Sequence, residues 1–128
     1  FYGIFQLNEK VGCTIGFDCG AQQVAKNDNN FNTWYSPVII LKVAPTKKIS
    51  LAARGELYQD KNGVIISTGT PNGFQTVGYS LNVDYNIQNN LVLRIEGRGF
   101  SSEDAIFINE ESPVNDNFFV ISSLAFSF

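Results

Sequence analysis

Residues 77–98, VGYSLNVDYNIQNNLVLRIEGR, constrain the fold more than any other part of the chain. Apolar residues occupy every second position from Val77 to Ile87, with polar or small residues between them. This period of two places successive side chains on opposite sides of a β-strand. The alternation resumes after Gln88-Asn89-Asn90 and continues to Arg98. The stretch therefore predicts a β-hairpin with a short polar turn and one apolar face.

The spacing also predicts the register of this hairpin. If Ile87 faces Leu91 across the turn, the polar positions pair as Asp84 with Arg94, Asn82 with Glu96, and Ser80 with Arg98. Opposite charges then meet across the two strands, and they do so only on the polar face.

The same alternation recurs along the chain and predicts an all-β fold of seven antiparallel strands. The expected strands are residues 1–7, 11–22, 35–43, 48–58, 77–87, 91–98 and 118–128. Short turns (8–10, 44–48, 88–90) alternate with long loops (23–34, 59–75, 101–117). Pro37 predicts an irregularity in its strand because proline has no amide proton. The glycines of residues 11–22 predict room for bulky neighbours within a closed, curved sheet.

Charge is confined to one predicted face. The apolar face of the seven strands carries no charged residue, whereas the polar face carries Asp18, Lys42, Lys48, Arg54, Glu56, Asp84, Arg94, Glu96 and Arg98. In a soluble barrel or sandwich the apolar face would enclose a core, and in an outer-membrane barrel it would meet lipid around a polar lumen.

Four features favour lipid. Strands of about 10 residues match a tilted crossing of the bilayer. Short turns at one rim and long loops at the other are typical of outer-membrane barrels. Small residues dilute the apolar face, which lipid tolerates better than a close-packed core does. Aromatic residues lie toward strand ends on that face, as in interfacial girdles: Tyr35, Tyr79, Tyr85, Phe118, Phe126 and Phe128. We therefore expect an antiparallel up-and-down transmembrane β-barrel.

Several segments carry a resemblance to known proteins. The final FFVISSLAFSF, with its aromatic last residue, resembles the assembly signal of bacterial outer-membrane barrels, which assigns that role to Phe126 and Phe128. ARGELYQDKNGVIISTGTPNGFQTVGYSLNVDY, RIEGRGFSSEDAIF, FDCGAQQ and WYSPVIIL resemble the C-terminal part of the OmpL-like putative β-barrel porin family. The resemblance implies a passive channel in the bacterial outer membrane and contact with the barrel-assembly machinery.

Strand parity adds an expectation about the whole barrel. Bacterial barrels have an even number of strands and short periplasmic turns. Seven strands that end in the periplasm would place Phe1 on the outer side, so an odd number of strands would precede it. The chain also lacks Met. We therefore expect residues 1–128 to form one incomplete domain, the C-terminal portion of a larger even-stranded barrel.

Other chemistry finds little support in the sequence. The chain has no His, so the common catalytic triads have no base, and no glycine-rich phosphate loop precedes a helix. Cys13 and Cys19 would share a face of one strand at roughly 20 Å, too far for a disulfide, and they form no zinc ligand set. A net charge of −3 without a basic run speaks against nucleic acid. We expect no enzyme activity, no cofactor and no metal.

The long loops are acidic, with Asp28, Asp60, Glu103, Asp104, Glu110, Glu111 and Asp116 against Lys26 and Lys61. We interpret these acids as a solvated outer rim, although calcium at Asp60-Lys61-Asn62-Gly63 or at Glu110-Glu111 is conceivable. The nine charges of the polar face fit either a hydrophilic pore lining or a salt-bridge network that fixes the wall, with Glu56 and Glu96 as partners of neighbouring arginines.

The leading hypothesis is a porin-like channel that passes small hydrophilic solutes through an Arg/Glu-lined lumen. One alternative is a soluble β-barrel or sandwich that binds an apolar ligand. The other is a barrel that serves as an anchor or adhesin through its acidic loops.

Overall fold

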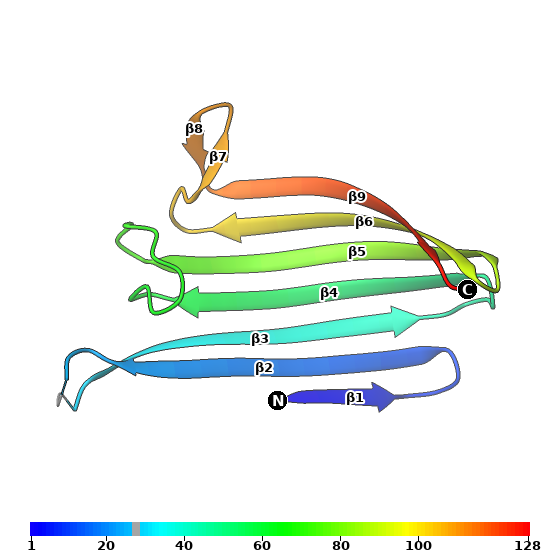
Figure 1. Ribbon diagram of the computed structural model, residues 1–128, viewed down its shortest axis with the longest axis horizontal. Helices are drawn as coiled ribbons and strands as arrows, with labels where there is room; N and C mark the ends of the chain where they lie inside the picture. The colour runs from blue at the N-terminus through cyan, green and yellow to red at the C-terminus, as the bar shows by residue number, and fades with distance from the viewer. Residues whose placement is uncertain (27–28) are drawn as a thin grey trace.

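The computed structural model describes residues 1–26 and 29–128. Seven strands form one antiparallel sheet in the order β1-β2-β3-β4-β5-β6-β9 (Figure 1). Their bounds are β1 Tyr2–Gln6, β2 Val11–Gln23, β3 Phe31–Val43, β4 Ile49–Asp60, β5 Phe74–Gln88, β6 Leu91–Ser102 and β9 Asp116–Phe126. Each strand pairs with the next strand of this sheet along the chain, and β6 pairs with β9 because β7 and β8 form a separate two-stranded sheet. The seven-stranded sheet is not closed, since β1 and β9 are its edges. The predicted all-β, up-and-down antiparallel order is confirmed.

The two ends of the sheet differ as the sequence predicts. Short turns join the strands at one end, and long connections join them at the other (Figure 1). The described residues contain no helix that is long and apolar enough to cross a bilayer.

The predicted register of the central hairpin is correct over most of its length. Asp84 lies opposite Arg94, Asn82 opposite Glu96, and Ser80 opposite Arg98. The expected pairing of Ile87 with Leu91 is wrong, because the register shifts between Asn86 and Gln88 and it is Gln88 that faces Leu91. Ile87 is the extra residue of a β-bulge, so the turn contains only Asn89 and Asn90.

Two further expectations about the chain's ends need correction. The last strand ends at Phe126, so Phe128 lies beyond it, and Ser127 donates its amide to the Asn90 carbonyl at 3.0 Å. Phe1 is not at a rim, because its amide and carbonyl pair with Phe17, midway along β2.

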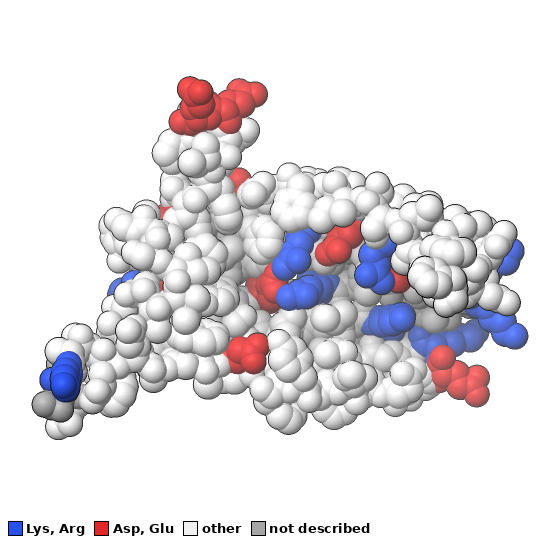
Figure 2. Space-filling view, in the orientation of Figure 1, with Lys and Arg blue, Asp and Glu red and all other residues white. Residues whose placement is uncertain are grey.

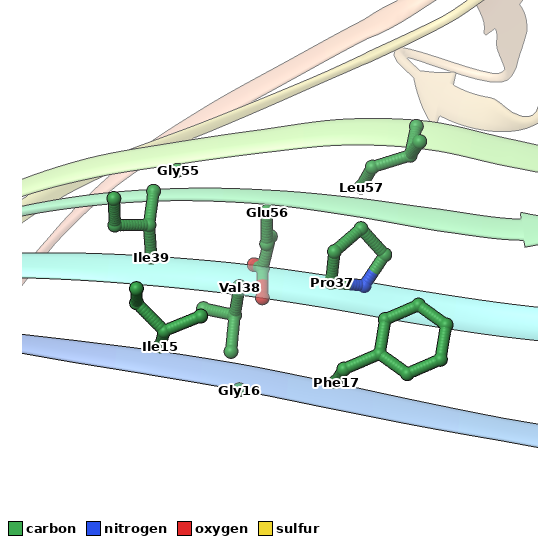
Figure 3. A pocket seen from close by; sticks show the side chains of 9 residues that line it. All are labelled: Ile15, Gly16, Phe17, Pro37, Val38, Ile39, Gly55, Glu56 and Leu57. Atoms are coloured by element: carbon green, nitrogen blue, oxygen red, sulfur yellow. The ribbon is translucent and has the colours of Figure 1, made fainter. Parts of the chain in front are cut away.

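The irregularity expected at Pro37 is present. The ladder between β3 and β4 holds Tyr35 opposite Gln59 and Val38 opposite Glu56, but it is interrupted between these pairs. A shallow hollow of about 360 Å³ lies beside the interruption, and Phe17, Pro37 and Leu57 are among its lining residues (Figure 3). The hollow marks the place where the missing amide of Pro37 loosens the sheet.

The apolar face is exposed to its surroundings. Leu81 is 70 % exposed, Val120 66 % and Phe118 64 %, and among the described residues Val38 is the one buried hydrophobic residue. A soluble barrel or sandwich that binds an apolar ligand would require an apolar core. The described residues enclose no such core.

Candidate functional site

Eight of the nine predicted charged residues lie on one face of the sheet, which we call the polar face, and Lys48 directly precedes β4. The register puts the even-numbered residues of β2 to β6 on this face, together with the odd-numbered residues of β9. Figure 2 shows basic and acidic side chains gathered side by side in the middle of this face, in a hollow between uncharged margins. Neighbouring strands thus bring charges from distant sequence positions together.

Glu56 is the centre of the largest ion-pair cluster. Its Oε2 accepts hydrogen bonds from Nε and Nη2 of Arg54, the former at 3.1 Å, and its Oε1 accepts one from Arg98. The Arg98 guanidinium also lies over the Phe100 ring, 4.9 Å from its centroid. Ser80, opposite both arginines in the register, is buried between them. The predicted pairing of Glu56 with neighbouring arginines is correct.

A second ion pair lies nearer the short turns. Arg94 donates from Nε and Nη2 to the two carboxylate oxygens of Asp84 at 2.6 and 2.7 Å. Asn82 adds a third hydrogen bond to this carboxylate at 3.0 Å. Such two-point contacts fix the orientation of both side chains. The charged side chains of these ion pairs therefore have fixed orientations on the polar face.

The remaining charges of the polar face are arranged more loosely. Asp18 accepts a hydrogen bond from the Tyr2 hydroxyl at 2.8 Å. Within the described residues Lys42, Lys48 and Glu96 form no salt bridge. The expected partnership of Glu96 with an arginine is therefore present only as an electrostatic interaction with Arg94. Glu96 lies opposite Asn82 on one side and Ile121 on the other. Lys42 and Lys48 are exposed and Glu96 is half-buried. Lys42 also interacts electrostatically with Asp84.

Glycines make room for the large side chains of this face, as the sequence predicted for β2. A Cβ on Gly16 would lie 2.5 Å from the Tyr2 ring, and one on Gly20 would lie 2.4 Å from Trp34. The sequence interpretation missed a third position of this kind. A Cβ on Gly78 would lie 2.6 Å from Glu56 Oε1, so Glu56 reaches its arginines only because position 78 lacks a side chain.

A row of aromatic side chains also lies on the polar face, toward the long loops. Trp34 and Tyr58 stack with centroids 5.9 Å apart, and Phe74 meets Tyr58 edge-on at 5.4 Å. Phe100 continues the row beside Phe119, with centroids 6.1 Å apart. The sequence interpretation considered aromatic residues only on the apolar face and missed this row. Its signal was present for Trp34, Tyr58, Phe74 and Phe100, because these residues share the even numbering of the charged positions.

The long-loop end contains one correction to the predicted solvated rim. Asp60 is 0 % exposed, and its carboxylate accepts the amides of Val64, Ile65 and Ile66 at 2.7 to 2.9 Å. The loop after β4 therefore folds back over Asp60, and this acid organises the loop. The described residues hold no group of three or more His, Cys, Asp and Glu that could bind a metal ion.

Asp104 ties two long loops together. Its carboxylate accepts the Asn72 backbone amide at 2.9 Å and the Asn72 side-chain amide at 3.1 Å. The Asn72 backbone amide is the main reason why the pKa of Asp104 lies below its usual value, and Thr70 and the Asn72 side chain add to the effect.

Glu110 and Glu111 form the acidic tip of a short hairpin of β7 (Phe107–Asn109) and β8 (Ser112–Val114) (Figure 2). Glu103 precedes this hairpin, and Asp116 begins β9. The sequence interpretation treated residues 101–117 as a loop and did not predict these strands. Asp28 of the predicted acidic set lies outside the described residues.

The predicted assembly residues have different surroundings. Phe126 pairs with Leu91 at the end of β9 and is 61 % exposed, whereas Phe128 follows the strand with its ring 6.2 Å from that of Phe126. Both rings lie at the short-turn end of the sheet, beside Asn90.

The arrangement is that of a two-sided wall. One face offers charges of both signs, hydroxyls and aromatic rings. The other offers mainly apolar and small side chains, with polar residues such as Gln59, Gln75 and Asp116 only toward the long-loop ends of the strands. The model of the putative beta-barrel porin-2, OmpL-like family matches residues 1–128. The chain belongs to this family.

Membership of the OmpL-like porin family accounts for the exposed apolar face, since a porin wall has a membrane setting. Members of this porin family are typically not enzymes. No curated protein and no solved structure matches the chain significantly.

Proposed function

We propose that the chain forms part of the wall of a bacterial outer-membrane channel that passes small hydrophilic solutes. In this channel the apolar face meets lipid and the polar face lines an aqueous lumen. The lining residues are Asp18, Lys42, Lys48, Arg54, Glu56, Asp84, Arg94, Glu96 and Arg98.

The observation that carries this proposal is the separation of charge between the two faces of one exposed sheet. The charged strand residues lie on the polar face, and among the described residues the one exception is Asp116, which begins β9 at the long-loop end. A hydrocarbon environment tolerates the apolar face and penalises charged side chains, whereas water solvates the polar face. The ion pairs of Glu56 and Asp84 hold their arginines against the wall, which keeps the passage open instead of letting long side chains fill it.

The edges of the sheet bear on the barrel as a whole. In lipid, an unpaired strand edge leaves amides and carbonyls without partners, so a spanning sheet has to close. We therefore propose that further strands complete the barrel, and that the barrel-assembly machinery recognises the β9 end through Phe126 and Phe128.

Planar-bilayer recording of the full-length protein tests the channel. We expect stepwise conductance, with an altered single-channel conductance and ion preference in Lys42→Glu, because this exposed cation faces the lumen. Leu41→Gln, on the opposite face of the same strand, is the matched control and should leave ion preference unchanged. Absence of both conductance and solute uptake into vesicles would contradict the proposal.

The anchor hypothesis makes a different prediction, motivated by the acidic β7–β8 hairpin. If the hairpin is the working part, deletion of residues 103–111 abolishes binding of a partner protein and leaves conductance unchanged. If the channel is the function, a variant of the lumen such as Lys42→Glu alters solute passage.

A further inference from the structure

We propose that the aromatic row of the polar face contains a binding subsite for the pyranose rings of saccharides. The inference rests on the proposed channel function, because the row would then lie in the lumen, near the long-loop mouth. The subsite is a cleft of about 140 Å³ lined by Ser36, Glu56, Tyr58, Phe74, Thr76 and Phe100, with Gly78 beside them.

The walls of the cleft are flat ring faces and edges. Tyr58 forms one wall and is backed by the stacked ring of Trp34, whose plane is inclined by only 8° to it. Phe74 stands nearly perpendicular to Tyr58, at 79°, and Phe100 stands near Phe107 and Phe119. All the rings of the cleft are half-buried, so they keep accessible surface. Aromatic surfaces of this kind suit the C–H face of a sugar ring.

The polar groups of the cleft suit hydroxyls. Thr76 is 4 % exposed, and its Oγ1 is buried without a hydrogen-bond partner. Ser102, opposite Thr76 in the register, also has a buried Oγ without a partner. A buried hydroxyl without a partner is unfavourable, so a ligand hydroxyl that hydrogen-bonds to Thr76 would be stabilised here.

Glu56 supplies an acceptor at the same place. Its carboxylate has about four lone-pair positions, and Arg54 and Arg98 occupy three of them. The remaining acceptor is held in place by both guanidinium groups, and they compensate its charge. Arg98 Nε of the same cluster is a buried donor without a partner. A neutral ligand whose hydroxyls both donate and accept hydrogen bonds therefore fits this environment better than a group that can only do one of these.

These features together separate saccharides from other solutes. An apolar ring would leave the Thr76 hydroxyl and the Glu56 acceptor unsatisfied. An open-chain polyol could bond to both, but it has no stable ring face to lay against Tyr58. A pyranose has both a ring face and peripheral hydroxyls.

Trp34, the one tryptophan of the 128 residues, provides the readout. Maltotriose is titrated into the folded full-length protein in detergent micelles, and the fluorescence difference from the Trp34→Phe variant is followed. We expect a saturable change with maltotriose and none with sorbitol or cyclohexanol. Tyr58→Ala should abolish the change, Thr76→Val should weaken apparent binding at least tenfold, and Thr76→Ser should restore it.

Tyr79→Ala, on the apolar face, is the control and should bind like the parent protein. No saturable change with maltotriose, an equal change with sorbitol or cyclohexanol, or a change that survives Tyr58→Ala would overturn the subsite. Binding is measured without a membrane, so conductance without sugar binding would refute the subsite and leave the channel proposal standing. Sugar binding without conductance or solute uptake would support the subsite and contradict the channel proposal.

Discussion

At the scale of single residues, small side chains decide where large ones can lie. Glu56 and Gly78 are 22 positions apart in the chain and are brought together by the pairing of β4 with β5. The sequence indicated that glycines of β2 make room for bulky neighbours, because they stand in a row. It did not single out Gly78, because the side chain that needs this room is Glu56 of the neighbouring strand β4. Alternation predicts the face on which Glu56 lies but not its rotamer.

Gly78→Ala tests this arrangement. The new methyl group would lie 2.7 Å from Glu56 Cγ and 3.0 Å from Phe100, so Glu56 has to leave its position between Arg54 and Arg98. We expect a loss of about 1–3 kcal/mol of stability, as for other overpacked sites. The midpoint of the heat-induced mobility shift on electrophoresis measures it. Gly97→Ala, whose methyl group meets only Phe118 at an ordinary 3.4 Å, should change little; equal effects of both variants would refute the explanation.

At the scale of elements, alternation predicted the strands and the face of each residue well, because a period of two leaves only two choices per strand. It predicted connections poorly. Three connections were not predicted: the β-bulge at Ile87, the loop folded over Asp60 and the β7–β8 hairpin. They depend on hydrogen bonds of backbone amides, and the pattern of side chains does not show which amides will form these bonds. The buried carboxylate of Asp60 is the clearest case. Composition alone predicts that an acid among turn-forming residues is exposed to solvent, whereas Asp60 is buried.

The turn of the β7–β8 hairpin is strained. Glu110 and Glu111 have φ angles of 46° and 69°, a region that favours glycine and asparagine. The pair Glu110→Asn and Glu111→Gly should therefore stabilise the hairpin by about 1–2 kcal/mol per relieved residue. Slower hydrogen exchange of the β7 and β8 amides would show this. The pair Glu110→Gln and Glu111→Gln removes the same charges without relieving the backbone, and an equal gain there would assign the effect to charge repulsion.

The link between Asp104 and Asn72 should depend on pH. The pKa of Asp104 is lower in the folded protein than in the unfolded chain, so its ionised form favours folding. The contribution is complete above the ordinary aspartate pKa of about 3.9 and is lost as the pH falls through the lowered value. The Asn72 amide resonance should report a titration step below that of free aspartate. Asp104→Asn should abolish the step, and a step at the ordinary value would contradict the link.

At the scale of the whole molecule, one sheet separates two environments. The sequence predicted this separation because apolar and polar residues alternate along the strands. The aromatic row and the pairing of the charges required the register of all strands together. Alternation cannot tell which medium meets which face; the exposure of the apolar side chains and the family match address that question.

A charge placed on the apolar face measures the medium directly. Leu81 lies near the middle of β5 and is 70 % exposed. Leu81→Arg should cost about 2–4 kcal/mol in a bilayer, whereas the neighbouring Asn82→Arg, which faces Glu96, should cost much less. Urea unfolding from lipid vesicles compares the two variants. Equal costs would mean that hydrocarbon does not cover the apolar face.

Cys13 and Cys19 are free thiols of β2, on the apolar face at different distances from the short turns. They provide two native labelling points for a depth measurement. Spin labels attached to them, one at a time after replacement of the other by alanine, would experience different oxygen and nickel-chelate collision rates. The ratio of these rates would locate β2 along the bilayer normal without the introduction of any foreign cysteine.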